Sequence, residues 1–236
     1  MIFNFTNDHK FTTSLQVGEK TLEVVDQAKL FGVLITNDLK WDQNTTYLVK
    51  KAYSRMELLR KVAEFTTTVE DKRNIYVQYI RNILEQSCAV WHSSLTIENS
   101  EDLERVQKSA VRIILGSDYK GYDDARIKVN LDALEERREY ICKNFAKKSI
   151  KSENVRSNEI FKEREKIHSM KTRNEECFEV NYAKTERYKK SAIPYMQKLL
   201  NCEENMKNSD ENGTTKGVKR KMAKMENERI KRRKPG

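Results

Sequence analysis

The sequence is poor in the two residues that most often interrupt regular structure, with seven glycines and two prolines among 236 residues. Sandwiches and barrels need a turn after every short strand, so this scarcity favours long helices over an all-β fold. Long apolar runs are missing too. No stretch approaches the roughly 20 apolar residues that span a bilayer, and the apolar start at Met1–Thr6 is too short for a signal peptide. Neither secretion nor membrane insertion is expected.

Residues that carry chemistry are also scarce. The four cysteines form no C-x-x-C pair and have no histidine at ligand spacing, so we expect reduced thiols in an intracellular protein and no metal or other cofactor. The three histidines lie in polar surroundings or at a helix end, and no glycine-rich phosphate loop is present. A polymerase needs paired carboxylates that hold divalent metal. Adjacent acidic pairs such as Glu70-Asp71 and Asp123-Asp124 lie instead at helix starts or in polar connectors. We therefore expect no catalytic residue and no enzyme activity.

Positive charge is concentrated at one end. The chain has a net charge of +10, and residues 209–236 hold ten basic and four acidic residues, or +6 of that total. This segment has almost no apolar content, so we expect residues 203–236 to be a disordered basic tail. Its two basic clusters are Lys219, Arg220 and Lys221, and Lys231, Arg232, Arg233 and Lys234. They are typical of a bipartite nuclear import signal or a non-specific nucleic-acid arm, which predicts a nuclear or cytoplasmic location and an import receptor as partner.

The first 36 residues alternate as strands do. We expect three short strands around Ile2–Phe5, Leu22–Val25 and Lys29–Thr36, with turns near Asn7-Asp8 and Gly18-Glu19. A sheet that begins at the first residue would have an unpaired edge, so we expect the chain to be cut from a longer one.

From Asp42 the apolar period becomes helical. The expected buried residues are Leu48, Ala52, Met56, Leu59 and Ala63 on a first helix; Tyr76, Ile80, Ile83 or Leu84, Ser87 and Trp91 on a second; and Leu103, Val106, Ala110 and Ile113 or Ile114 on a third. Thr68-x-x-Asp71 predicts a capping box at the start of the second helix. A fourth helix, near 131–151, should bury Leu134, Tyr140, Ile141 and Phe145 and close the bundle. Residues 37–152 are thus predicted to be one helical bundle.

The rest of the chain is weakly patterned. Residues 153–202 are expected to be a linker followed by a short closing strand at Cys177–Tyr182 and a brief helix at Tyr195–Leu200. The predicted fold is mainly α, with a small antiparallel β element at residues 1–36 and the basic tail at the end.

Basic residues line the solvent side of two predicted helices. Arg105, Lys108 and Arg112 lie opposite the apolar face of the third helix, and Lys51 and Arg55 form an i, i+4 pair on the first. Such faces dock on a bundle while contacting phosphates, or they serve only to keep the surface soluble. Both interpretations stay open from the sequence.

Several loose motifs then occur in a particular order. They are Lys29-Leu30-Phe31-Gly32-Val33, Leu39-Lys40-Trp41, Tyr79-Ile80-Arg81 with Leu84-Glu85 and Val90-Trp91, Leu103–Lys108, Leu134–Arg138 with Cys142-Lys143 and Phe145-Ala146, and Thr185–Tyr195. Over residues 1–201 this order resembles the region downstream of the catalytic palm in reverse transcriptases of jockey-like non-LTR (LINE) retrotransposons. The family more often has leucine or tyrosine-leucine where this chain has Leu30-Phe31. The basic tail lies outside the family pattern.

The resemblance implies a primer-grip turn at Leu30, Phe31, Gly32 and Val33, followed by a helical thumb. It implies backbone contacts with a template–primer through Lys51, Arg55, Arg105, Lys108 and Arg112. The metal-binding aspartates of the family are not in this sequence. We therefore expect a non-catalytic fragment that binds RNA or DNA weakly. Two alternatives are a vestigial or domesticated protein-interaction module that does not bind nucleic acid, and the C-terminal part of a longer active reverse transcriptase.

Overall fold

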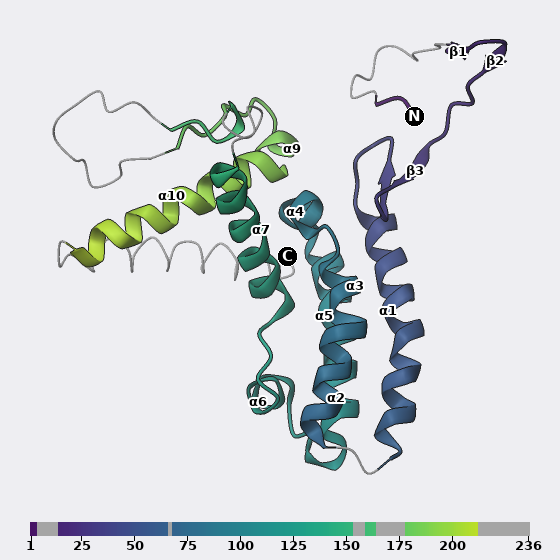
Figure 1. Cartoon of the computed structure of the whole chain (residues 1–236), viewed down its shortest axis with the longest axis vertical. Coiled ribbons are helices and arrows are strands. Elements are labelled where there is room, and N and C mark those ends of the chain that lie inside the picture. The colour runs from purple at the N-terminus through teal and green to yellow at the C-terminus, as the bar shows by residue number, and fades with distance from the viewer. Residues whose placement is uncertain (4–13, 66–67, 153–158, 164–177, 212–236) are drawn as a thin grey trace, which may run out of the picture. The chain divides into compact units, whose positions relative to one another are not determined.

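The computed structural model is mainly helical, with two small antiparallel hairpins near its N-terminus (Figure 1). It describes residues 1–3, 14–65, 68–152, 159–163 and 178–211. The chain divides into two compact units. Unit 1 comprises Met1–Ser87 and Glu98–Leu134, and unit 2 comprises Cys88–Ile97 and Glu135–Gly236.

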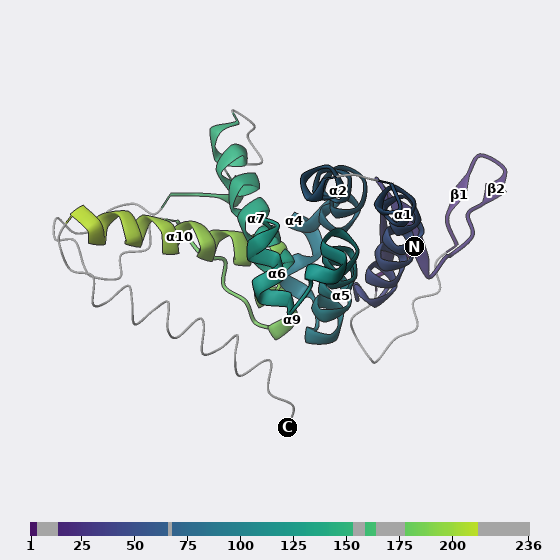
Figure 2. The same cartoon turned by 90° about the horizontal axis from the view of Figure 1, so that it is seen from below.

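Unit 1 begins with two β-hairpins and continues as a helical bundle. The elements are β1 (Gln16–Val17), β2 (Lys20–Thr21), β3 (Gln27–Leu30), β4 (Val33–Thr36), α1 (Asp42–Ala63), α2 (Val69–Ile75), the π-helix η1 (Tyr76–Arg81), α3 (Asn82–Glu85), α5 (Ile97–Leu115), the 3-10 turn η3 (Gly116–Asp118) and α6 (Tyr122–Lys128). Figure 2 shows α1, α2 and α5 as neighbouring helices of this bundle.

Two interhelical hydrogen bonds set the direction of α5 against α1. Asn99 Nδ2 donates to Asp42 Oδ1 at 2.6 Å near the starts of both helices. Eleven residues into α1, the Tyr53 hydroxyl lies 3.5 Å from Ser109 Oγ of α5. The two helices therefore run parallel. The continuous segment α2–η1–α3, which lies between them in the chain, runs in the opposite direction.

The predicted apolar faces of the three helices form the core of unit 1. On α1 the buried residues are Leu48, Ala52, Met56 and Leu59; on the second helix Tyr76, Ile80, Ile83 and Leu84; and on α5 Leu103, Val106, Ala110 and Ile114. Ala63 and Ile113 are only partly buried. Helical spacing alone predicted most of these buried residues, because each helix buries one stripe of side chains along its length.

The predicted capping box is present at the start of α2. Thr68 Oγ1 accepts a hydrogen bond from the Asp71 N–H at 3.1 Å, and the Thr68 N–H donates to Asp71 Oδ2 at 3.2 Å. The Thr68 hydroxyl also donates to Asp71 Oδ2 at 2.6 Å, and this bond is the main reason why the pKa of Asp71 is lowered.

This lowered pKa predicts a pH dependence. Because the folded pKa lies below the unfolded one, the Asp71 carboxylate stabilises the fold above its ordinary pKa, and that contribution is lost as the pH falls through the folded pKa. Chemical denaturation should therefore show a smaller loss of stability between about pH 5 and about pH 2 in Asp71→Asn than in the wild type. Equal pH slopes in the two proteins would contradict the prediction.

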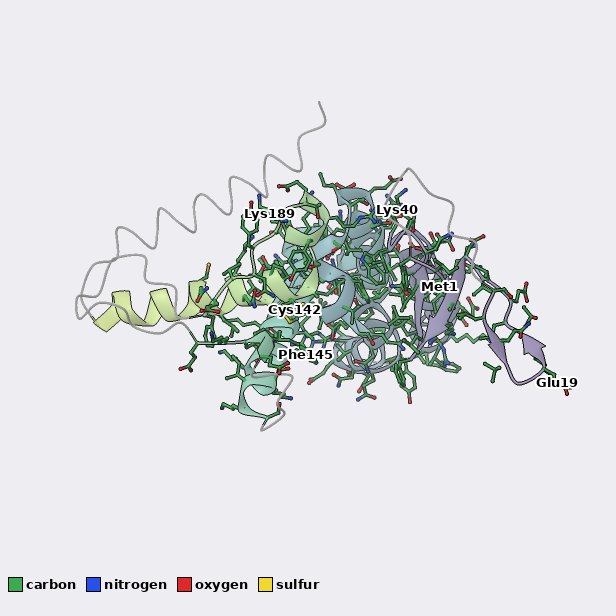
Figure 3. The ribbon with its side chains drawn as sticks, turned by 90° about the horizontal axis from the view of Figure 1, so that it is seen from above. Met1, Glu19, Lys40, Cys142, Phe145 and Lys189 are labelled. Carbon is green, nitrogen blue, oxygen red and sulfur yellow. The ribbon has the colours of Figure 1, made fainter. Side chains whose placement is uncertain are left out.

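Two predicted strands of unit 1 are wrong, and a third falls mostly outside the described residues. Lys29–Thr36 is not one strand, because the chain reverses at Phe31-Gly32 to form the β3–β4 hairpin. Leu22–Val25 forms no strand; the predicted turn at Gly18-Glu19 instead joins β1 to β2, and Glu19 marks its tip in Figure 3. The strand expected at Ile2–Phe5 falls mostly outside the described residues.

The second predicted helix is shorter than expected. It ends at Glu85 rather than continuing to Trp91, because Ser87 has a φ of 52°, a left-handed conformation that a helix cannot accommodate. Ser87 is exposed, whereas Trp91 is buried in unit 2. Between the third and fourth predicted helices the structure contains an additional helix, α6, which the sequence pattern did not predict.

Unit 2 contains α4 (Cys88–Trp91), the 3-10 turn η2 (His92–Ser94), α7 (Leu134–Lys151), α9 (Glu186–Lys189) and α10 (Ala192–Glu211). Its apolar cluster consists of Cys142, Ala146, Phe161, Phe178, Met196, Leu199 and Leu200. Cys88, Cys142 and Cys202 are free thiols.

The predicted core face of α7 is largely wrong, because only Leu134 is buried as expected and Ile141 is partly buried. The helix buries Leu134, Arg138, Cys142 and Ala146 at a spacing of four, whereas Tyr140 and Phe145 are 56% and 51% exposed. Cys142 and Phe145 are both labelled on α7 in Figure 3. The small side chains of Cys142 and Ala146 let this part of the helix approach its neighbours closely, so burial there follows fit rather than the size of the apolar groups.

The end of unit 2 also differs from expectation. The predicted strand at Cys177–Tyr182 is reduced to a single bridge between Glu163 and Phe178, and Cys177 lies outside the described residues. The brief helix expected at Tyr195–Leu200 is the twenty-residue α10, which continues nine residues into the segment predicted to be disordered.

Candidate nucleic-acid interface

The residues predicted to form a primer-grip-like turn make the tip of the β3–β4 hairpin. Leu30 pairs with Val33, and the two residues between them, Phe31 and Gly32, have φ values of 48° and 84°. Positive φ at both central positions is the signature of the two-residue type I′ hairpin. Val33 is buried, but Phe31 is 90% exposed. The turn thus presents an aromatic ring to solvent.

This tip is anchored to the bundle at three points. A Cβ placed on Gly32 would lie 2.2 Å from Nε2 of Gln86, so the turn rests directly on the end of α3. The Leu34 N–H donates to Oδ1 of the buried Asn44 at 3.0 Å. Lys29 Nζ donates to the Tyr47 hydroxyl at 2.7 Å. These contacts fix the hairpin on the helical bundle, and with it the backbone that carries Phe31.

Two lysines gather on the ring of Tyr47. Lys29 Nζ lies 4.5 Å from the ring centroid, and Lys51 Nζ, one turn further along α1, lies 5.9 Å from it. The hydrogen bond from Lys29 is the main reason why the pKa of Tyr47 is lowered. The structure thus places a small positive cluster beside the hairpin.

The three predicted cations of α5 have different surroundings. Arg105 forms an ion pair with Asp102 at 2.7 Å. Lys108 Nζ lies 5.2 Å from the ring centroid of Tyr122, and Arg112 Cζ lies 5.3 Å from that of Tyr119. Neither of these two cations forms a salt bridge with a carboxylate in the described part of the chain. No described carboxylate therefore offsets the positive charge of Lys108 or Arg112, and the tyrosine rings restrict where these cations lie.

A buried polar network holds Tyr122 beneath Lys108. Gln107 Nε2 donates to the Tyr122 hydroxyl at 2.9 Å and to the Asp132 carbonyl at 2.8 Å. The Tyr122 hydroxyl in turn donates to Glu104, whose other carboxylate oxygen accepts the Leu134 N–H at 3.0 Å. Burial and the Glu104 charge raise the pKa of Tyr122, which keeps this hydroxyl protonated as a donor.

The structure does not bring all five predicted phosphate-binding residues together. The side chain of Tyr53 marks the flank of α1 that faces α5, through its contact with Ser109. Lys51 and Arg55 lie two residues before and after Tyr53, and two residues correspond to about 200° around a helix. They therefore occupy the opposite flank of α1, and the candidate interface on α5 contains only Arg105, Lys108 and Arg112.

Sequence reasoning missed the tyrosines of this interface. The sequence pattern assigned no role to Tyr47, Tyr119 or Tyr122. Spacing could have suggested Tyr47, which precedes Lys51 by one helical turn. Tyr119 and Tyr122 gave no such signal, because the chain must fold back along α5 to bring them beside its cations.

The acidic pairs considered for metal binding have structural roles or are exposed. Asp71 belongs to the capping box, Asp102 pairs with Arg105, and Asp123 and Asp124 lie exposed in the first turn of α6. Within the described ranges, no group of three or more His, Cys, Asp or Glu side chains is placed to hold a metal ion.

Among the described residues, no helix combines the length and apolar character needed to cross a bilayer. The tail residues Lys219–Lys221 and Lys231–Lys234 lie outside the described residues. No family model matches the sequence, and no curated protein or solved structure matches it significantly.

Proposed function

We propose that unit 1 is a thumb-like module of a non-LTR retrotransposon reverse transcriptase, which binds nucleic acid through its phosphate backbone and has no polymerase activity of its own. The observation that carries the proposal is the placement of Lys108 and Arg112, which lie one helical turn apart on α5, stacked on tyrosines and not neutralised by described carboxylates. The order of motifs that resembles the retrotransposon family supports the same conclusion.

The chemistry of these cations suits a sequence-independent contact. Cations held at a fixed spacing attract phosphates of any sequence, and binding releases the counterions that the phosphates had condensed. The β3–β4 hairpin adds an exposed aromatic ring, Phe31, which is suited to stacking on a base. Nothing in this arrangement requires a metal or a cofactor.

The test is a salt titration of binding to a labelled RNA–DNA primer–template. Every protein in the series is the full chain with the seven basic residues of the two tail clusters changed to glutamine, which leaves residues 209–236 with three basic and four acidic residues and therefore close to neutral. Lys108→Gln/Arg112→Gln should reduce the slope of log K against log salt by about 2, because each phosphate contact contributes about 0.9 on duplex DNA.

A matched control removes two charges that are already paired. Arg105 forms an ion pair with Asp102, and Lys128 forms one with Asp118 at 2.9 Å. Arg105→Gln/Lys128→Gln should therefore change the salt slope much less than the test pair does. An equal effect of the two double variants would contradict the role given to Lys108 and Arg112. Loss of all binding in the tail-neutral parent would favour the module that does not bind nucleic acid.

A further inference from the structure

Helix α1 carries a second, exposed stripe in addition to its buried face. Leu58 is 41% exposed and Phe65 is 72% exposed, although both are large apolar side chains. Val62 lies between them and is partly buried. A helix at the edge of a bundle needs only one apolar face, so these residues are not explained by the core of unit 1.

The spacing of this surface is regular. Lys51, Arg55, Leu58, Val62 and Phe65, which we call the α1 stripe, follow one another at intervals of four, three, four and three residues. Glu64, which caps the helix, keeps helical dihedrals (φ −72°, ψ −23°), so the spacing holds as far as Phe65. Alternating intervals of three and four are those of a helix–helix seam. At 1.5 Å per residue the stripe is about 21 Å long, or about four helical turns.

The charges along the stripe have one sign. Lys51, Arg55 and the neighbouring Lys61 form no salt bridge with any carboxylate of the residues placed in the structure. Two acidic residues lie close to them in the sequence: Glu57, which pairs with Arg60 at 3.2 Å, and the exposed Glu64, three residues after Lys61. An apolar seam flanked by uncompensated cations is complementary to a seam flanked by carboxylates.

We propose that the α1 stripe binds an acidic amphipathic helix of a partner protein. Large aliphatic side chains of the partner helix cover Leu58, Val62 and Phe65. The carboxylates of the partner helix face Lys51, Arg55 and Lys61. This is the helix-against-groove mode of recognition, with anchors at i, i+4 and i+7. The proposal assigns Lys51 and Arg55 to a protein partner rather than to phosphates, and it concerns a different flank of α1 from the one that faces α5.

Other occupants fit the charges less well. The chain's own residues 209–236 carry +6, so they repel the stripe rather than complement it. A second copy paired antiparallel would place Lys51 and Arg55 against the apolar Leu58–Phe65 end of its partner. Nucleic acid would leave Leu58 and Phe65 against charged phosphates.

A membrane surface is also a poorer match. A neighbouring face of α1, about 100° around the helix from the stripe, is committed to the core of unit 1, with Leu48, Ala52, Met56 and Leu59 buried. The helix therefore cannot sink several ångströms into the headgroup boundary as an interfacial helix does. A narrow seam on a fixed helix is better suited to another helix.

The test uses a fluorescein-labelled, 18-residue designed peptide whose leucines alternate at spacings of three and four and whose flanks carry glutamate. We expect it to bind the full chain, and Leu58→Gln/Phe65→Gln should weaken binding about tenfold or more, as loss of central apolar anchors does. Lys51→Gln/Arg55→Gln should weaken binding and lower its salt dependence. Ile127→Gln/Tyr79→Gln, which removes two other exposed apolar side chains of unit 1, is the matched control and should bind normally.

Four results would overturn the proposal. One is unchanged peptide binding in Leu58→Gln/Phe65→Gln, and another is equal binding of the same peptide with lysine in place of glutamate. The third is binding of the stripe to phosphatidylserine vesicles but not to the peptide. The fourth is a sedimenting dimer that Leu58→Gln/Phe65→Gln dissociates, which would identify a second copy as the occupant. Lys108→Gln/Arg112→Gln should leave peptide binding unchanged, so failure here and failure of the nucleic-acid proposal are distinguishable.

Discussion

Replacing Gln107 with leucine should lower the free energy of unfolding by about 2–5 kcal/mol, because it leaves two polar groups without partners in or beside the core of unit 1. The Tyr76 hydroxyl, completely buried, donates to Gln107 Oε1 at 2.7 Å. The Asp132 carbonyl accepts from Gln107 Nε2 at 2.8 Å. Urea denaturation monitored by circular dichroism measures the change.

A double-mutant cycle separates lost hydrogen bonds from altered packing. Tyr76→Phe removes the donor alone and should cost less than Gln107→Leu. The two changes together should cost less than the sum of the single changes, since the second no longer leaves the first partner unsatisfied. Strict additivity would show that the Tyr76–Gln107 bond does not link the two positions energetically.

This network also bears on the candidate interface. Gln107 supports the Tyr122 hydroxyl at 2.9 Å, and the Tyr122 ring lies under Lys108. A Gln107→Leu protein that is still folded at low temperature should therefore hold Lys108 less firmly. The position of a single buried amide thus connects the stability of unit 1 with the placement of a cation on its surface.

Replacing Gly32 with alanine should destabilise the protein by about 1–3 kcal/mol and loosen the β3–β4 hairpin. Two effects act together. Its φ of 84° is one that side-chain-bearing residues rarely adopt, and the new Cβ would lie 2.2 Å from Gln86 Nε2. Denaturation and hydrogen exchange at Leu34, whose N–H donates to Asn44, report the global and local effects.

Gly116→Ala is the matched control for this change. Gly116 also has a positive φ, 56°, but a Cβ placed there would meet nothing within 4 Å. It should therefore show the conformational cost alone, and Gly32→Ala should cost more. A shorter side chain in Gln86→Ala should restore part of the stability of Gly32→Ala. If the two glycine variants are equally stable, the contact between the hairpin tip and α3 contributes nothing.

Local sequence patterns predicted the structure correctly where the interactions that form an element lie within one stretch of the chain. The capping box at Thr68 and Asp71 satisfies its own helix end, and it formed as the spacing indicated. On α1 and α5, most of the residues that the helical spacing grouped on one face are buried. The turn at Gly18-Glu19 needs only a glycine that tolerates positive φ.

Elsewhere the deciding contacts come from distant parts of the chain. Lys29–Thr36 has the composition of one strand, but the reversal at Phe31-Gly32 is supported by Gln86, more than fifty residues away. Which face of α7 is buried depends on the segments packed against it. These segments cover Cys142 and Ala146 and leave Tyr140 and Phe145 exposed. Apolar content alone does not identify the face that a neighbouring element covers.

By itself the sequence determined the class of this protein: helical, with a small β element at the start and charge concentrated at the end. It also determined which face of each of the three bundle helices is apolar, because the periodicity of a helix depends only on the residues of that helix. Only the tertiary structure decided that Lys108 and Arg112 lie on tyrosines while Arg105 is neutralised, and that Lys51 and Arg55 occupy another flank. The charge of a side chain is a property of its own residue, but its partners depend on which segments the fold brings beside it.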